Sequence, residues 1–270
     1  MALYVIATPI GNLGDITQRA RETLVACDAV VAEDTRHSGR LLKTLGIHKP
    51  LISLPAFDEA ARVEPLVRRL LAGETLALVT DAGTPAVSDP GGLLVREAVA
   101  AGVQVVPIPG ASAALAAVSV SGFPEGRFHF AGFLPRKASQ RAEMLAELRP
   151  LRAQLVFFES PHRVGETLSD LRAALGDRPA LVARELTKLH EELARGLLSG
   201  LAQRFAGEVR GEVAIVVSGA PEEAPADAAD LESEIRSRLS RGDRPKDIAE
   251  SLSGKHSKRA VYQLALKLKG

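Results

Sequence analysis

The sequence has almost no cysteine: its 270 residues contain one, Cys27, together with six histidines and no tryptophan. A single cysteine excludes a disulfide within the chain and a cysteine-rich metal site. The histidines show neither H-x-x-x-H nor H-E-x-x-H spacing, so we expect no metal site. This sparing use of cysteine fits a reducing compartment, and we expect a cytoplasmic location.

The sequence also lacks a strong net charge and a long apolar run. Its formal net charge is +1, so any electrostatic attraction to a nucleic acid or a membrane must be local. No uninterrupted apolar stretch is long enough to predict a membrane span. The N-terminal segment MALYVIATPIGN has no basic start, so we expect no signal peptide.

What the sequence does contain is an alternation of apolar strands and amphipathic helices. The hydrophobic content of 46% is ordinary for a globular protein, and the length suits two moderate domains with a small appendage. In the first part, continuous runs of Val, Ile and Leu predict a largely parallel sheet buried on both faces. The predicted strands are 3–7, 29–34, 51–54, 75–79 and 103–108, and the predicted helices are 17–26, 38–45, 59–72 and 91–101.

A second α/β region follows the small-residue segment 109–122. Its predicted strands are 128–134, 154–159, 180–185 and 212–219, with helices at 138–148 and 162–175 and a candidate further strand at 191–198. Helices are then predicted at 231–241, 245–252 and 255–269, where ten Lys and Arg outnumber five Asp and Glu. We therefore expect α/β domains at 1–112 and 113–219, a linker at 220–230, and a small basic helical domain at 231–270 that resembles a helix-turn-helix.

Four loops rich in Gly, Pro and Asp follow strands of the first region: 7–12, 32–39, 80–92 and 107–113. Because the carboxyl ends of parallel strands share one edge of a sheet, these loops are expected to lie together where such folds bind ligands. Bare backbone at glycines lets a ligand approach the main chain. The alternative is ordinary turn chemistry, which is less convincing for all four loops together than for any one.

Neither common phosphate-binding loop is present in the chain. There is no G-x-x-x-x-G-K-[ST] motif and no G-x-G-x-x-G after the first strand. The loops are therefore expected to hold a ligand with little phosphate, for which a nucleoside-type molecule fits best.

Charged residues gather after the strands of the second region. The segment ESPHR supplies Glu159, His162 and Arg163, and ARELTKLHEE supplies Arg184, Glu185 and Lys188. We expect these groups to end neighbouring strands and to face a cleft, where a carboxylate and a guanidinium could orient a hydroxyl or bind a phosphate. The alternative is a solvated rim.

Two further charged segments are candidate sites. EDTRHSGR places Glu33, Asp34 and Arg36 close together, either at a site or as the charged start of a helix. PRKASQR at 135–141 carries basic residues that suggest an anionic partner. Aromatic residues make up 4% of the chain, so base stacking is not expected as the main binding mode.

The motifs VIATPIGNLGDIT, AEDTRHS, TDAGTPAVSDPG, PIPGASA, FFESPHR and ARELTKLHEE occur in this order. Together they resemble the ribosomal RNA small subunit methyltransferase I group, a branch of the tetrapyrrole methylase superfamily. The resemblance implies two α/β domains with S-adenosylmethionine in the inter-domain cleft, a small C-terminal helical domain, and a homodimer. It implies 2'-O-methylation of a cytidine ribose in small-subunit ribosomal RNA, free or in the assembled subunit.

The resemblance also implies which residues bind the methyl donor. They are Pro9, Gly11, Asp81, Gly83, Thr84, Pro85, Gly110, Ser112, Ala113 and, beside the adenine, Phe158. Asp81 has an alternative role, because an aspartate commonly braces a turn by accepting hydrogen bonds from the amides that follow it.

Methyl transfer to a ribose hydroxyl needs a group that accepts its proton, but no metal. Glu159 and Glu185 are our candidate bases, with His162 as a second choice. The cations expected to contact RNA are Arg36, Arg136, Lys137, Arg163, Arg184, Lys188, Lys255, Lys258 and Arg259.

Two other functions stay open: a methylase of a tetrapyrrole precursor, and a non-catalytic RNA- or nucleotide-binding protein. The first is disfavoured, because porphyrin-type relatives carry G-x-G-P-G-D where this chain has ATPIGNLGD.

Overall fold

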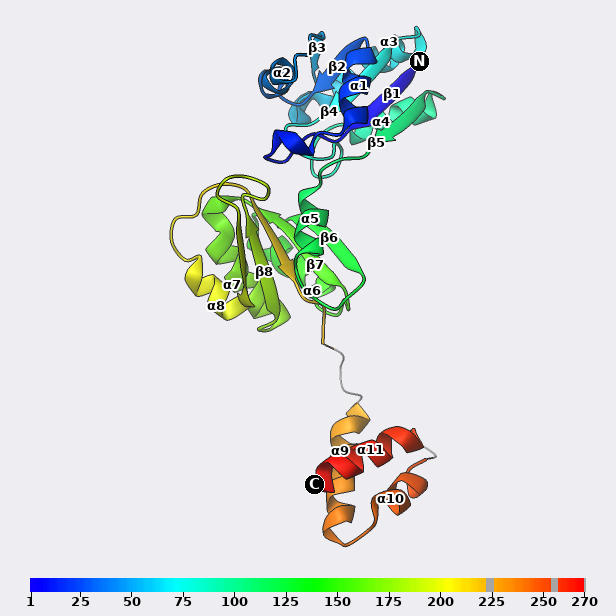
Figure 1. Ribbon diagram of the computed structural model, residues 1–270, viewed down its shortest axis with the longest axis vertical. Helices are drawn as coiled ribbons and strands as arrows, with labels where there is room; N and C mark the ends of the chain where they lie inside the picture. The colour runs from blue at the N-terminus through cyan, green and yellow to red at the C-terminus, as the bar shows by residue number, and fades with distance from the viewer. Residues whose placement is uncertain (222–225, 254–256, 270) are drawn as a thin grey trace. The chain divides into compact units, whose positions relative to one another are not determined.

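The computed structural model describes residues 1–221, 226–253 and 257–269. It divides into two compact units, Met1–Gly219 and Ala220–Gly270. The first unit contains both β-sheets, and the second consists of helices (Figure 1). Separate domains at 1–112 and 113–219 stay a prediction.

The first sheet is entirely parallel, as the continuous apolar strands predicted. Its strand order is β3-β2-β4-β1-β5. The strands are β1 (Ala2–Ile6), β2 (Ala29–Ala32), β3 (Leu51–Ser53), β4 (Thr75–Val79) and β5 (Gln104–Ile108). Consecutive residues of β2 such as Val30 and Val31 are both fully buried, because helices cover both faces of the sheet.

Two pairs of helices form the outer layers of this sheet. One face packs on α1 (Gln18–Ala26) and α2 (Thr35–Thr44), and the other on α3 (Glu59–Leu71) and α4 (Gly92–Ala100) (Figure 1). Helix α2 begins three residues before the predicted position because the carboxylate of Asp34 caps it, accepting the Arg36 N–H at 2.8 Å. Short 3₁₀ turns lie at Leu13–Asp15 and Ala56–Asp58.

The second sheet is mixed, with strand order β6-β7-β10-β8-β9. Its strands are β6 (Phe128–Phe133), β7 (Gln154–Glu159), β8 (Pro179–Arg184), β9 (Glu192–Leu197) and β10 (Val213–Val217). Strands β6 and β7 are parallel, whereas the other pairs are antiparallel. Strand β9 confirms the candidate strand at 191–198.

The expectation that Glu159 and Arg184 end neighbouring strands is wrong. Strand β10 lies between β7 and β8, and its first residue, Val213, pairs with Glu159 on one side and Arg184 on the other. The two strand ends still share one edge of the sheet, separated by the start of β10.

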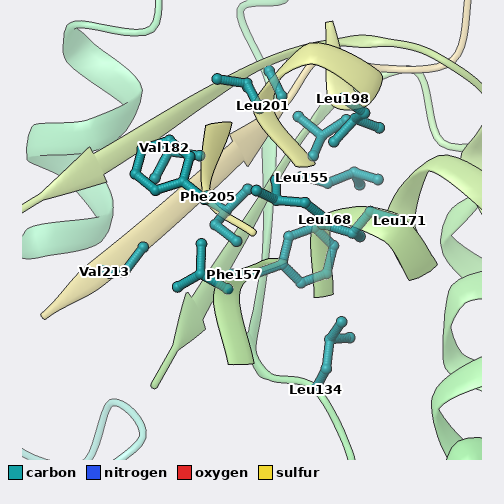
Figure 2. Packing of buried hydrophobic residues seen from close by; sticks show 14 of the residues in the cluster. Leu134, Leu155, Phe157, Leu168, Leu171, Val182, Leu198, Leu201, Phe205 and Val213 are labelled. Carbon is teal, nitrogen blue, oxygen red and sulfur yellow. The ribbon is translucent and has the colours of Figure 1, made fainter. Parts of the chain in front are cut away.

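Helices cover both faces of the second sheet as well. Helix α5 (Ala113–Ser119) covers one face, and α6 (Ala138–Leu148), α7 (Val164–Leu175) and α8 (Leu198–Arg204) cover the other. Figure 2 shows Leu155 and Phe157 of β7 packed among leucines of α7 and α8. Helix α8 was not predicted, because its short sequence includes Gly200 and directly follows a strand. A 3₁₀ turn at Pro161–Arg163 precedes α7.

The C-terminal unit has a small core of its own. Helices α9 (Ala226–Ser240), α10 (Pro245–Ser251) and α11 (Lys258–Lys269) bury Ile235, Ile248 and Val261. Helix α9 begins inside the segment expected to be a linker, of which residues 222–225 lie outside the described part. Across the described ranges, no helix is long and apolar enough to cross a membrane.

Candidate functional site

A cavity of about 480 Å³ lies in the first unit, between loops of the first sheet and strand ends of the second. Its first wall comes from the loops after β1, β2, β4 and β5, as the sequence predicted. The residues of this wall are Ile10, Glu33, Thr80, Asp81, Ala82, Gly83, Thr84, Val87, Ser88, Asp89, Ser112 and Ala113. The second wall consists of Phe133, Phe158, Glu159, Ser160, Pro161, Ala183, Leu186, Gly211, Glu212, Val213 and Ala214.

Backbone hydrogen bonds hold two loops of the first wall together. The N–H of Thr8 donates to the Gly83 carbonyl at 2.8 Å, and the N–H of Gly83 donates back to Thr8 at 3.1 Å. Gly83 has a φ of 81°, which a residue with a side chain rarely adopts. Because the Gly83 N–H donates to Thr8, it does not donate to Asp81 as the turn-bracing alternative expected. Oδ1 of Asp81 is buried without a hydrogen-bond partner among the described residues.

A carboxylate from α3 fixes the far end of the loop 80–92. Oε1 of Glu59 accepts hydrogen bonds from the N–H groups of Gly91, Leu93 and Leu94, at 3.0, 2.9 and 3.4 Å. These amides form the first turn of α4, where a negative charge is favourable. The loop that carries Asp89 is thus anchored at its C-terminal end.

Three carboxylates converge on this first wall. The Thr80 hydroxyl lies 2.8 Å from Oδ2 of Asp89 and 3.3 Å from Oε2 of Glu33, and Asp81 is the next residue. Burial, followed by the charges of Asp89 and Asp81, raises the pKa of Glu33. Burial also raises the pKa of Asp89, with a further contribution from Asp81. No described cation forms an ion pair with these three residues, so the wall presents uncompensated negative charge.

The second wall is mostly apolar and includes two aromatic rings. The ring centroids of Phe133 and Phe158 lie 5.8 Å apart in an edge-to-face arrangement. The other neighbour of Phe158 is Phe130, with the centroids 5.0 Å apart. Ala183, Val213 and Ala214 complete a surface that suits a flat apolar group.

Glu159 lines the pocket, but its carboxylate is already well bonded. Oε1 accepts the Ser160 N–H at 2.7 Å, and Oε2 accepts the Thr167 hydroxyl at 2.6 Å. Arg163 lies 3.5 Å from the same carboxylate, whose side chain is fully buried. The Ser160 hydroxyl also lies 3.3 Å from Oε1, so these four contacts engage most of the roughly four lone-pair positions of the carboxylate, and Glu159 has to exchange a partner to accept a proton.

The two other candidate bases do not line the pocket. Glu185 bonds Nζ of Lys188 at 2.8 Å and the Glu212 N–H at 2.9 Å. The bond from Lys188 is the main cause that lowers the pKa of Glu185, which makes this carboxylate a weaker base. His162 is exposed in the turn before α7.

Six of the ten residues expected to bind the donor line the pocket: Asp81, Gly83, Thr84, Ser112, Ala113 and Phe158. The other four shape its loops. Pro9 and Pro85 are buried, and Gly110 lies against Ala7, where a Cβ would come within 3.0 Å of the alanine Cβ. Gly11 lies against the side chain of Lys188, which leaves no space for a Cβ.

The cations expected to contact RNA fall into two groups. Five are engaged by carboxylates: Arg36 by Asp34, Arg163 by Glu159, Arg184 by Glu192, Lys188 by Glu185 and Glu212, and Lys258 by Glu250. Exposed Arg136, Lys137 and Arg259 form no ion pair with another described residue. Lys255 lies outside the described residues.

Arg141, which the sequence places beside Arg136 and Lys137, is not available to a partner. Its buried guanidinium pairs with Glu166 and Asp170 and donates to the carbonyls of Pro135 and Arg136. It holds the turn that presents the two exposed cations.

Sequence reasoning left Glu33 open as a site residue and did not assign Thr80, Asp89 or Phe133 to the pocket. For the first three a signal existed, because they follow β2 and β4 in the loops already singled out. For Phe133 there was none, because a backbone irregularity in β6 decides where its ring points.

Within the described ranges, no group of three or more His, Cys, Asp or Glu side chains could hold a metal ion.

Comparisons with known proteins agree with this architecture. The model of the family described as Tetrapyrrole (Corrin/Porphyrin) Methylases matches residues 2–202. Ribosomal RNA small subunit methyltransferase I from Xylella fastidiosa (strain Temecula1) is 48% identical over 225 residues, covering 82% of each chain. The protein of the same name from Synechocystis sp. is 43% identical over 272 residues, covering 98% of each chain.

A solved structure shares the fold at low sequence identity. The native form of uroporphyrin III C-methyl transferase from Thermus thermophilus aligns with a TM-score of 0.59 and 18% identity, covering 81% of this chain and 97% of that one. The expected fold and resemblance are thereby confirmed. The chain belongs to the tetrapyrrole methylase family, in the group whose curated members are named ribosomal RNA small subunit methyltransferase I.

Proposed function

We propose that this protein is an S-adenosylmethionine-dependent methyltransferase that acts on small-subunit ribosomal RNA. The relatives' shared name supports the substrate class. The observation that carries the proposal is the two-walled pocket, with uncompensated carboxylates on one wall and aromatic rings on the other. We further propose, from the motif resemblance, that the acceptor is the 2'-hydroxyl of a cytidine.

The pocket residues fit the chemistry of this donor, which carries a sulfonium, an ammonium group, a carboxylate and an adenine. Asp89, Glu33 and the unpartnered oxygen of Asp81 offer negative charge to the cationic groups. Phe158 and the apolar residues around it suit the adenine. Gly83 exposes its backbone at the junction of the two loops, where main-chain groups can bind the ligand directly.

The donor supplies an activated methyl group, so the protein has to position the acceptor and receive its proton. Holding the two reactants in line contributes up to roughly 7–11 kcal/mol in the best intramolecular cases. The rigid loop pairing at Thr8 and Gly83 and the anchor at Glu59 provide such positioning. No metal ion is required for this step.

Among the three candidate bases, Glu159 is the one at the pocket. We expect Glu159→Gln to lower the single-turnover rate at saturating donor and RNA by roughly 10²-fold or more, the usual contribution of a positioned base. Glu185→Gln is the matched comparison, because this carboxylate lies outside the pocket. Wild-type rates for Glu159→Gln would remove it as the base, and a loss confined to Glu185→Gln would reverse the assignment.

The cations we propose for RNA contact are Arg136 and Lys137, which follow Phe133 of the second wall in the chain, and Arg259, Lys258 and Lys255 of the C-terminal unit. The already paired Arg36, Arg163, Arg184, Lys188 and Lys258 have to exchange carboxylate partners to bind phosphate. We also propose a homodimer and a cytoplasmic location, in keeping with the family resemblance and the substrate.

The direct test offers labelled donor with two acceptors in parallel: small ribosomal subunits and a corrin precursor. We expect label in the RNA of the subunits. Label in the corrin alone would favour a methylase of a tetrapyrrole precursor. Donor binding without transfer to either acceptor would favour a non-catalytic RNA- or nucleotide-binding protein. Repeating the assay with protein-free RNA separates an assembled substrate from a free one.

A further inference from the structure

Strand β6 contains a β-bulge beside the pocket. Phe130 pairs with Val156 of β7, but the next paired residue is Gly132, opposite Phe157, so Ala131 is an extra residue. Gly132 has a φ of 65°, in the left-handed region. Bulges of this kind commonly re-aim a side chain next to a functional site.

The bulge determines the face on which Phe133 lies. In a regular strand, residues 130 and 133 point to opposite faces, because side chains alternate. With the extra residue, Phe130 lies opposite Val156 and Phe133 opposite Phe158, which belong to the same face of β7. Phe133 is thereby directed to the pocket instead of the leucine core on the other face.

The ring of Phe133 remains incompletely covered in this position. The rings of Phe133 and Phe158 meet edge to face, yet Phe133 is 55% exposed while lining the cavity. The bulge itself is held close to the first wall, because a Cβ on Gly132 would lie 3.3 Å from the Ser88 hydroxyl. The fold thus keeps a large apolar surface open at one defined place.

Two free cations follow this ring in the chain. Arg136 and Lys137 are exposed and unpaired among the described residues, at the turn that Arg141 holds by bonding the carbonyls of Pro135 and Arg136. Three or four residues span at most about 10–14 Å, so these charges lie within reach of a nucleotide stacked on Phe133. An aromatic ring beside cations is the combination that binds single-stranded RNA.

We propose that Phe133 is the stacking platform for a nucleobase of the RNA substrate, with Arg136 and Lys137 holding the adjoining phosphates. This inference rests on the proposed function and specifies how the same pocket receives its acceptor. The donor's adenine is assigned to the deeper Phe158, which has a phenylalanine on each side. A single ring meets this need, so the low aromatic content of the chain is no obstacle.

The test compares Phe133→Ala and Phe133→Tyr with the full-length wild-type protein. We expect Phe133→Ala to raise the KM for small-subunit RNA by roughly tenfold, as lost stacking on one base implies. Its affinity for S-adenosylhomocysteine, measured by calorimetry without RNA, should fall much less than the KM for RNA rises, because the adenine is assigned to Phe158. Phe133→Tyr should restore the wild-type KM. The matched control is Phe128→Ala, which removes another exposed ring from β6 away from the pocket.

The outcomes separate this inference from the proposed function. A parallel loss of S-adenosylhomocysteine affinity with an unchanged KM for RNA would assign the ring to the donor's adenine and overturn the proposal. Unchanged values for both would also overturn it. Wild-type protein that transfers no methyl group to RNA would overturn the proposed function itself. If the wild type is active and Phe133→Ala has the wild-type KM for RNA, only the stacking role is overturned.

Discussion

At the scale of single residues, the pocket keeps negative charge where it costs stability. Asp89 and Glu33 flank the Thr80 hydroxyl, and no described cation pairs with either. Buried like charges raise each other's pKa and disfavour the folded state at neutral pH. Such a cost is common at sites that bind an oppositely charged ligand, and here it fits the cationic end of the proposed donor.

Asp89→Asn should therefore stabilise the protein at neutral pH while weakening donor binding. The folded-state pKa of Asp89 is raised, mainly by burial, so the folded protein holds this proton more tightly than the unfolded chain. Stability then falls as pH rises from the ordinary aspartate pKa through the raised value. The gain in Tm from the substitution should be largest above this window and should vanish below it.

Thermal unfolding at several pH values, with calorimetry of donor binding, checks this prediction. Glu74→Gln is the control of opposite sign, because the bond from Arg69 lowers the pKa of Glu74. That variant should lose stability at neutral pH, and the loss should shrink as the medium becomes acidic. A fall in Tm for Asp89→Asn at neutral pH would show that the wall is not a stability cost.

At the scale of elements, the loop 80–92 depends on a helix that does not touch the pocket. Glu59 is the first residue of α3, and its carboxylate binds the amides at the start of α4. The loop also contains Ala86 and Ser88 with φ of 63° and 70°, a conformation that the surroundings must enforce. Glu59 is thus a positioning residue for the first wall.

Glu59→Ala should raise the KM for the donor by roughly tenfold while changing kcat less, since one helix-capping interaction contributes about 0.5–2 kcal/mol. Glu59→Gln keeps an acceptor oxygen and should recover part of the affinity. Asp177→Ala is the matched control, because Asp177 bonds the Ser199 N–H at the start of α8, away from the pocket. Equal changes in donor KM for both alanine variants would mean that general destabilisation, not positioning, is responsible.

Much of this element-level arrangement could be predicted from the sequence. Continuous apolar strands indicated a parallel sheet, and parallel strands bring the loops 7–12, 32–39, 80–92 and 107–113 to one edge. The insertion of β10 between β7 and β8 could not be predicted, because an antiparallel strand can return to several places in a sheet. The bulge at Ala131 and the pairing of Glu185 with Lys188 also depend on tertiary contacts that leave no local pattern.

At the scale of the whole molecule, the two units have separate cores. The pocket and the four larger clusters of buried residues lie within Met1–Gly219, and the fifth cluster lies within the C-terminal helices. The C-terminal unit carries exposed Arg259 without an ion pair to a described residue. This separation indicates that donor binding and RNA binding can be uncoupled by truncation.

A chain that ends at Gly219 should bind S-adenosylhomocysteine with wild-type affinity but bind small-subunit RNA more weakly. The full-length protein should lose RNA affinity more steeply with salt than the truncated chain, because each lost phosphate contact lowers the salt dependence. Calorimetry and RNA-binding titrations at several salt concentrations measure both effects. Unchanged RNA affinity together with a change from dimer to monomer in sedimentation would identify the C-terminal unit as an assembly module.

The most direct test of the central claim is ribose mapping of ribosomal RNA by mass spectrometry, in cells that lack this chain and in cells where it is restored. We expect that one 2'-O-methylcytidine of the small-subunit RNA disappears without the chain and returns with it. An unchanged set of ribose modifications in the small-subunit RNA would show that this protein is not the ribose methyltransferase proposed here.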